Sequence, residues 1–452
     1  MYDRLKGFRD FYPEEMAARR EIVDTVEDAC RRYGFRETAS PFLEPAEMWT
    51  DKSGEDIVDE LYAFEDRGER HVTLAPELTP TVARMIAAKQ QELSKPIKWF
   101  STRPFWRYEQ VQQGRFREFY QTNADIFGTD DPRADAEVIA LAAEYLSDLG
   151  LDADDVEIRV SHRDILGAVL RSFDSDVDRR AAIRAVDKSE KIDRTEYHDL
   201  LCDAGLSYDE AAEFDDLLVG TDRDSLSELA DTAGTDTARD AVANLTAVLD
   251  AVDDFGAGEF CTLSLETARG LDYYTGVVFE CFDAAGEVSR AVLGGGRYDD
   301  LIEEFGGQPT PAVGFGQGYA TLPLLLERAG VAPEQSLSTD YYVLQVGDTE
   351  PAAASVTREL RAQGHVVETD LSDRSFGAQL GYADSINAET VVIVGENDLA
   401  DGNYTLRDME TGEQDLENDE VTLKEMDEGE QISVPVDEFP GDRDRPTFAD
   451  YE

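Results

Sequence analysis

A long hairpin of two strands, expected over residues 97–128, constrains the fold of this chain more than any other feature of the sequence. Residues 97–109 read IKWFSTRPFWRYE and residues 116–128 read FREFYQTNADIFG, and both segments are typical of strands. The intervening VQQGR contains Gly114, which suits a turn. Strands joined this way pair antiparallel, so we expect an α+β domain built on an antiparallel sheet.

The hairpin also brings charged and polar side chains together. Because side chains alternate along a strand, Arg107 and Glu109 are expected on one face of the first strand. By the same alternation, Gln121, Asn123 and Asp125 share one face of the second strand. These side chains can form the floor of one site.

Basic residues are concentrated in and before this hairpin, although the chain as a whole is strongly acidic. With 42 basic and 99 acidic residues, the formal net charge is −57. Cations retained in such an acidic chain indicate an anionic ligand such as nucleotide phosphates, whose oxygens match the geometry of the guanidinium group. The alternative is a solvated loop that happens to be basic. The basic segment contains Lys95, Lys98, Arg103, Arg107, Arg115 and Arg117 against a single acid, Glu109.

The overall charge suggests the environment of the protein. Only eight of the 42 basic residues are lysines. An acidic, lysine-poor chain is typical of proteins that work in very concentrated salt, where charge repulsion is screened within ~3 Å at 1 M. We therefore expect a halophilic protein; an acidic protein of an ordinary cell is the alternative.

Length and apolar content indicate more than one domain, since 452 residues with 41% apolar side chains exceed the usual size of a single core. We expect a first domain over residues 1–330, with a helical insertion at about 172–256. A linker at 331–340 then leads to an α/β domain with a parallel sheet over 341–452, which carries an acidic extension at about 412–430. Helices are expected over residues 14–33, 80–93, 131–149 and up to about 328, with Thr79 as the N-cap of the second.

Several classes of protein are excluded by missing signals. Neither GxxxxGK[ST] nor a strand-linked GxGxxG occurs, which argues against P-loop and Rossmann nucleotide sites and leaves arginine side chains to hold phosphates. No apolar run reaches the ~20 residues of a membrane span, and MYDRLKGFRDFYPEE is unlike a secretion signal, so a cytoplasmic protein is expected. Four cysteines without CxxC spacing predict neither a metal site nor disulfides.

Several segments carry a resemblance to a known family. PFLEP at 41–45 resembles motif 1 of class II aminoacyl-tRNA synthetases, and FWRYE with GRFREFYQ resembles motif 2. ARGLDYYTGVVFE, GGGRYDDLIEEFGG and TPAVGFG resemble the histidine-specific region of histidyl-tRNA synthetases, and residues of about 340–445 resemble their anticodon-binding domain. The resemblance implies a histidine–tRNA ligase that uses L-histidine, ATP with Mg²⁺ and tRNA(His), without a tightly bound cofactor, and that forms a homodimer through motif 1.

The resemblance also implies roles for the motif 2 residues. Arg107 would hold the α-phosphate of ATP and the substrate carboxylate, Glu109 would contact adenine, and Arg115 would reach the distal phosphates. An ion pair at a strand edge is the structural alternative for each of these residues.

Four further residues are implied to hold the amino group of histidine: Glu77, Thr79, Gln121 and Asp125. A pair of carboxylates suits an ammonium group electrostatically. Thr79 can equally be explained by its expected place as a helix N-cap.

The segment from Arg269 to Tyr274 is the most specific part of the resemblance. Arg269 would stabilise the negative charge that develops when a carboxylate attacks the α-phosphorus, and Tyr273 and Tyr274 would recognise imidazole. Arg269 and Tyr273 share a face if the run is a strand, and the tyrosines could alternatively be core aromatics. Glycines 294–296 would let the backbone approach the substrate, or simply form a turn.

One departure from the family raises a second reading. Motif 3 usually has an arginine after its last glycine, but Ala320 and Thr321 stand there, which leaves Arg115 and Arg297 as candidates for the distal phosphates. The chain could therefore be a histidine-binding regulatory paralogue of the ATP phosphoribosyltransferase system. The expected anticodon-binding domain favours the synthetase over this paralogue, and a synthetase for another amino acid is the remaining alternative. The reaction needs no protein nucleophile, so His71 and His162 are expected to be structural.

Overall fold

The computed structural model of the protein describes residues 2–50, 58–173, 175–189, 192–269, 273–334, 337–401, 403–409 and 431–435. The chain forms two compact units. The first contains Met1–Phe11 and Ala18–Pro333, and the second contains Tyr12–Ala17 and Glu334–Glu452. Each unit is described by itself.

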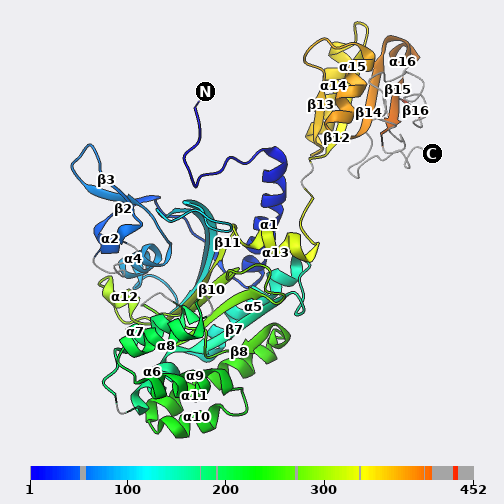
Figure 1. Ribbon diagram of the computed structural model, residues 1–452. Helices are drawn as coiled ribbons and strands as arrows, with labels where there is room; N and C mark the ends of the chain where they lie inside the picture. Colours follow the sequence, from blue (N-terminus) through cyan, green and yellow to red (C-terminus); the bar gives the residue numbers. More distant parts are fainter. Residues whose placement is uncertain are drawn as a thin grey trace. The chain divides into compact units, whose positions relative to one another are not determined.

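An eight-stranded sheet is the centre of the first unit (Figure 1). Its strand order is β1-β5-β6-β11-β10-β9-β7-β8, and every pair is antiparallel except the outer pairs β1–β5 and β7–β8. The expected hairpin is its longest pair of strands, so the predicted α+β class is confirmed. The strands are β1 (Arg36–Glu37), β5 (Ile97–Trp106), β6 (Glu118–Phe127), β7 (Val156–His162), β8 (Cys261–Leu263), β9 (Val277–Asp283), β10 (Leu293–Arg297) and β11 (Ala312–Gly318).

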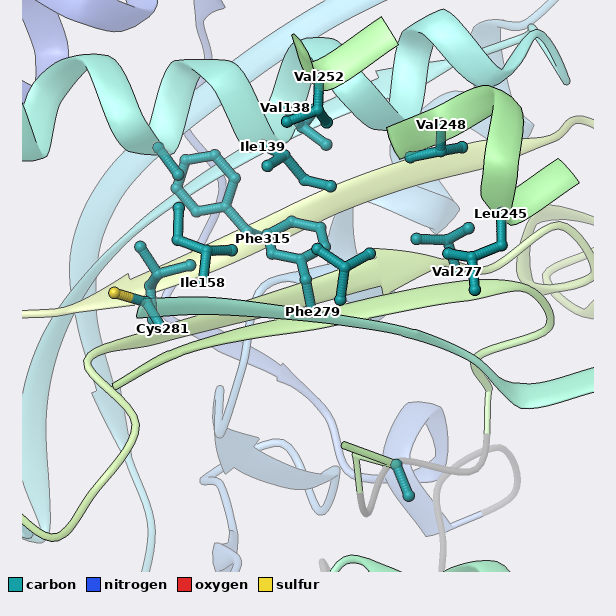
Figure 2. Close-up of a cluster of buried hydrophobic side chains, with 14 of the residues drawn as sticks. Val138, Ile139, Ile158, Leu245, Val248, Val252, Val277, Phe279, Cys281 and Phe315 are labelled. Carbon is teal, nitrogen blue, oxygen red and sulfur yellow. The ribbon is translucent and has the colours of Figure 1, made fainter. Parts of the chain in front are cut away.

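One face of this sheet is covered by α5 (Pro132–Asp148), α11 (Asp236–Asp254) and the buried side of α1 (Pro13–Arg32). Apolar side chains at helical spacing on α5 and α11 meet inward-facing residues of the strands, as Figure 2 shows. The contact consists of buried apolar side chains and supports the sheet on this face. It includes Val138, Ile139, Leu245, Val248 and Val252 of the helices and Ile158, Val277, Phe279, Cys281 and Phe315 of the sheet.

The opposite face packs against a three-stranded sheet and short helices. Because Ala124 and Ile126 belong to the core under α5, Asp125 and Phe127 point to this second face. The elements are β2 (Leu43–Pro45), β3 (Tyr62–Glu65), β4 (His71–Leu74), α2 (Glu47–Thr50), α4 (Thr79–Lys89) and α12 (Leu301–Glu304).

The start of α4 differs from the sequence-based expectation. The N-cap is Leu78 and makes no side-chain cap hydrogen bond, so Thr79 is the first helical residue and the prediction that it caps the helix was wrong. The helix also ends at Lys89, short of the expected Leu93. The hydroxyl of Thr79 is therefore not needed for capping.

The acidic region before β8 forms helices, as expected. Asp178, Asp193, Ser207 and Thr235 each accept backbone N–H bonds at the start of a helix, which explains where four of these helices begin. The unit's remaining helices are α6 (Arg163–Ser172), α7 (Arg179–Val186), α8 (Arg194–Asp203), α9 (Tyr208–Gly220), α10 (Leu226–Ala233), the short η2 (Gly258–Phe260) and α13 (Leu322–Ala329).

The second unit is an α/β domain with a five-stranded sheet in the order β13-β12-β14-β15-β16. The predicted parallel pairing holds for β13, β12 and β14, but β15 and β16 add antiparallel, so the sheet is mixed. The expected acidic extension at 412–430 lies outside the described residues. The elements are β12 (Thr339–Val346), α14 (Glu350–Ala362), β13 (Val367–Thr369), α15 (Phe376–Ser385), β14 (Ala388–Gly395), α16 (Glu396–Asp401), β15 (Asn403–Asp408) and β16 (Gln431–Pro435).

Across the part of the chain that the structure describes, no helix combines the length and the apolar character that a membrane span requires.

Candidate active site

A pocket of about 1010 Å³ opens on the second face of the eight-stranded sheet. Side chains of β6 and backbone of β10 and β11 form its floor, and α4 and the hairpin loop contribute to its walls. The structure brings all ten sequence-predicted site residues to this pocket: Glu77, Thr79, Arg107, Glu109, Arg115, Gln121, Asp125, Arg269, Tyr273 and Tyr274.

Glycines of β11 make room for the polar floor. Gly314 pairs with Asp125, and a Cβ on Gly314 would lie 2.0 Å from the Asp125 Oδ1. A Cβ on Gly316 would lie 2.5 Å from Nε2 of Gln121, whose amide in turn donates to Asn123 Oδ1 at 2.8 Å. The two side chains of β6 can lean over β11 because these positions are glycine.

Asp125 and Glu77 are two of the buried carboxyl groups that line the pocket. The Tyr298 hydroxyl donates to Asp125 Oδ1 at 2.5 Å, yet burial raises the pKa of Asp125 to about 7 against this hydrogen bond. Burial also raises the pKa of Glu77. Tyr273 donates to Glu77 Oε2 at 3.3 Å, whereas the buried Oε1 has no hydrogen-bond partner among the described residues. An acceptor is therefore left for a cationic or N–H-bearing ligand.

Arg269 reaches the pocket from an irregular segment, not from a strand. The residues between β8 and β9 that the structure describes form no strand, so the condition under which Arg269 and Tyr273 would share a strand face is not met. Arg269 has a left-handed backbone with φ of 53°, and its Nη1 donates to Glu280 Oε1 at 2.6 Å. Its guanidinium carbon lies 5.7 Å from the Tyr274 ring centroid.

The glycine run on β10 leaves space for the side chain of Arg269. A Cβ on Gly294 would lie 2.0 Å from Arg269 Nη1, and a Cβ on Gly295 would lie 2.3 Å from the Gly314 carbonyl oxygen. Neighbouring protein groups therefore already explain two of the three glycines.

The hairpin loop supplies the second charged cluster. β5 ends at Trp106, so Arg107 and Glu109 lie in the loop after the strand and not, as predicted, on one of its faces. Arg107 Nε donates to the Pro76 carbonyl at 3.0 Å, and its Nη1 lies 3.9 Å from the buried carboxylate of Glu109. The same carboxylate pairs closely with Arg115.

Most of the basic segment has structural partners. Of its six cations, only Arg107 and Arg115 line the pocket. The interpretation as a phosphate-binding segment was therefore too broad. Lys95 donates to Thr310, Lys98 pairs with Glu137, Arg103 donates to the Ser40 and Pro41 carbonyls, and Arg117 donates to the Glu109 carbonyl and stacks on Tyr108.

Arg297 is not available to a ligand, which corrects the expectation that it could hold phosphates. It is buried, pairs with Asp135 at 2.5 Å and with Asp299 at 3.2 Å, and does not line the pocket. A different cation, Arg290, does line the pocket. The sequence contained a signal for it, since Arg290 is an isolated cation in an acidic chain just before the glycine run.

The histidines considered in the sequence do not reach the pocket. His162 accepts the Asp164 N–H through Nδ1 at 3.2 Å and so caps α6, and burial lowers its pKa to about 4. His71 is exposed on β4. Two of the four free cysteines, Cys30 and Cys281, are buried as expected, and the other two are partly exposed.

Comparisons with known proteins agree with this geometry. A family model described as histidyl-tRNA synthetase matches residues 7–322, and one described as anticodon binding domain matches residues 340–415. The chain is 66% identical over 451 residues to proteins named Histidine--tRNA ligase from Haloarcula marismortui and Natronomonas pharaonis, with 100% of each chain covered. The solved histidyl-tRNA synthetase of Nostoc sp. matches with a TM-score of 0.80, 25% identity and 97% of both chains covered.

Proposed function

Because the chain belongs to the histidyl-tRNA synthetase family, we propose that its pocket holds L-histidine and ATP side by side over β6 and β11. The activity is that of a histidine–tRNA ligase. Histidine and ATP form histidyl-adenylate and pyrophosphate. The terminal ribose hydroxyl of tRNA(His) then forms an ester with the histidyl group, and AMP leaves. The regulatory alternative is not favoured, since full-length relatives between 62% and 66% identical are named as ligases.

The amino group of histidine lies between Glu77 and Asp125 in this proposal. An ammonium group has three N–H donors, and the unpartnered buried Glu77 Oε1 is the observation that carries the assignment most directly. Thr79, which does not cap its helix, and Gln121 complete the set of polar groups. Tyr273 and Tyr274, whose ring centroids lie 4.9 Å apart, recognise imidazole.

The reacting centre lies between Arg107 and Arg269. A carboxylate oxygen of histidine attacks the α-phosphorus, the bond from this phosphorus to the bridging oxygen breaks, and pyrophosphate leaves with the electron pair. Negative charge accumulates on the α-phosphate oxygens, where fixed guanidinium groups stabilise the transition state. Arg107 binds the α-phosphate and the carboxylate, and Arg269, held by Glu280, stabilises the developing charge.

Residues of the hairpin loop bind the remaining parts of ATP. Glu109 contacts adenine and Arg115 reaches the distal phosphates. Because Arg115 pairs with Glu109 in the structure, the ATP phosphates must replace Glu109 as the partner of Arg115. Mg²⁺ enters with ATP as part of this co-substrate and neutralises phosphate charge. No side chain is needed as a nucleophile, since positioning and charge stabilisation supply the rate.

The domains divide the work on tRNA. Residues 1–330 carry the chemistry, 331–340 form a linker, and 341–452 bind the anticodon. The protein works as a homodimer in the cytoplasm of a halophile. The acidic composition and the halophilic relatives support the halophilic host, and the resemblance of residues 41–45 to motif 1 supports the dimer.

Histidine-dependent exchange of pyrophosphate into ATP, measured in concentrated KCl, tests the proposal. Wild type should exchange, Arg269→Ala should lose at least about 100-fold in rate, and the exposed helical variant Arg239→Ala should match wild type. Absence of exchange in wild type would overturn the adenylate chemistry. Undiminished exchange in Arg269→Ala would remove that residue from its role.

A further inference from the structure

Arg290 differs from the other pocket arginines because it has no partner. It is half-buried at the pocket wall, and among the described residues it makes no ion pair and no hydrogen bond. In a chain with 99 acidic and 42 basic residues, a cation of this kind is unusual. Arg107, Arg115 and Arg269, by contrast, each face a carboxylate.

We propose that Arg290, together with Arg115, binds the distal phosphates of ATP and thereby replaces the arginine that motif 3 lacks. This inference rests on the proposed function and assigns a ligand contact to a residue outside the motifs that carry the family resemblance.

The position of Arg290 supports the replacement. A Cβ built on Gly114 would lie 3.5 Å from Cδ of Arg290 and 3.4 Å from Oγ1 of Thr321. The Arg290 side chain therefore passes beside both the hairpin turn and Thr321, one of the two residues found where motif 3 usually has arginine. Arg290 lines the same pocket as Gly114 and Thr321, and it reaches the pocket from the loop before β10.

The electrostatic surroundings indicate a ligand with more than one negative charge. Burial lowers the pKa of Arg115, and the nearby Arg290 charge lowers it further, so the two guanidinium groups repel each other. Glu60 acts in the opposite direction on Arg115, whereas burial alone lowers the pKa of Arg290. A polyanion placed between the two cations would remove this repulsion.

Arg107, Arg115 and Arg290 all line the pocket. The charges of Arg290 and of Arg107 both lower the pKa of Arg115. In the proposal, Arg107 holds the α-phosphate of ATP, and Arg115 and Arg290 hold the distal phosphates. The guanidinium fork suits the terminal phosphate oxygens.

The experiment compares two ligands that differ in the distal phosphates. Full-length wild type, Arg290→Ala, Arg290→Lys and the control Arg239→Ala are titrated in concentrated KCl with ATP and with a non-hydrolysable histidyl-adenylate analogue. The analogue lacks the β- and γ-phosphates. Arg290→Ala should weaken ATP binding roughly 10- to 100-fold and leave the analogue within about twofold, as expected for loss of a charge-assisted contact. Arg290→Lys should show an intermediate loss because it keeps the charge without the fork.

Three outcomes would overturn the inference. They are unchanged ATP binding, an equal loss for both ligands in Arg290→Ala and Arg290→Lys, or, in aminoacylation kinetics of the same variants, an effect confined to the KM for tRNA. The last result would assign Arg290 to the phosphates of tRNA instead. Failure of the proposed function itself would look different, since wild type would then bind neither ligand and show no exchange.

Discussion

The guanidinium of Arg269 donates to the carboxylate of Glu280 across 2.6 Å, and both groups line the pocket. Since the backbone of Arg269 is irregular, with φ of 53°, this bond to β9 fixes the side chain. Glu280→Gln should lower the rate constant of adenylate formation by about 10-fold or more and leave the affinities for ATP and histidine nearly unchanged. Single-turnover kinetics with separate binding titrations measure this split. An equal loss of affinity and rate would instead make Glu280 a general structural residue.

Gly294 leaves space for the same guanidinium group. In Gly294→Ala the new Cβ would lie 2.0 Å from Arg269 Nη1, so the flexible arginine has to move while the sheet can stay intact. We expect pyrophosphate exchange to fall by at least about 10-fold with little change in unfolding midpoint. Gly220→Ala is the matched control, because nothing lies within 4 Å of its built Cβ. A large drop in unfolding midpoint without selective loss of exchange would contradict this account.

The sequence predicted the hairpin and the residues around it because strand alternation and short-range turn signals are local. Gln121 and Asp125 reach the pocket as alternation requires. The exact path of the chain at the ends of these elements was less predictable. Arg107 and Glu109 lie beyond the end of their strand, and Thr79 does not cap α4, since tertiary packing sets where an element begins and ends.

Long-range pairing explains the remaining differences. Arg297 and Arg290 lie seven positions apart and look equally suitable for phosphate in the sequence. Only the fold reveals that Arg297 meets Asp135, a residue 162 positions away, whereas Arg290 forms no ion pair with any acid that the structure describes. Charge pairing between distant segments cannot be read from local pattern, so the wrong arginine was chosen.

Asp125 gives the site a pH dependence. Burial raises its pKa to about 7 from the ordinary value of 3.8, so between pH 4 and 7 the folded state holds a proton that the unfolded state has released. This group's contribution to folding stability therefore falls as pH rises to about 7 and is constant above it. The ionised carboxylate needed for an ammonium ligand forms in the opposite direction, as pH rises through about 7.

We accordingly expect the dissociation constant for histidine to fall between pH 6 and 8, beyond the change caused by the ligand's own imidazole. Asp125→Asn should bind histidine more weakly at pH 8. The dissociation constant of this variant should change with pH only through the titration of the ligand's own imidazole. Calorimetric titration across this range tests the difference between the two proteins. Parallel pH profiles would remove Asp125 from the ammonium site.

The Arg297–Asp135 pair predicts a stability effect without a ligand effect. Both side chains are almost completely buried, so Arg297→Ala leaves an uncompensated carboxylate and should lower the free energy of unfolding by about 3–5 kcal/mol. Arg133→Ala, which breaks an exposed pair with Asp131, should change it little. Denaturant unfolding in constant high salt measures both. A stable Arg297→Ala variant with weakened ATP binding would restore Arg297 as a phosphate ligand.

The net charge of −57 predicts a fold that depends on salt. Repulsion among carboxylates is screened within ~3 Å at 1 M salt but extends to ~30 Å at 0.01 M, so dilution of KCl should unfold the protein and abolish exchange. The described tryptophans, Trp49, Trp99 and Trp106, lie in the first unit and report its unfolding by fluorescence. Sucrose at matched osmolarity should not replace KCl, because a neutral solute screens no charge. Full activity in dilute buffer would show instead that the fold is stable despite the repulsion among its carboxylates. The halophilic assignment would then be wrong.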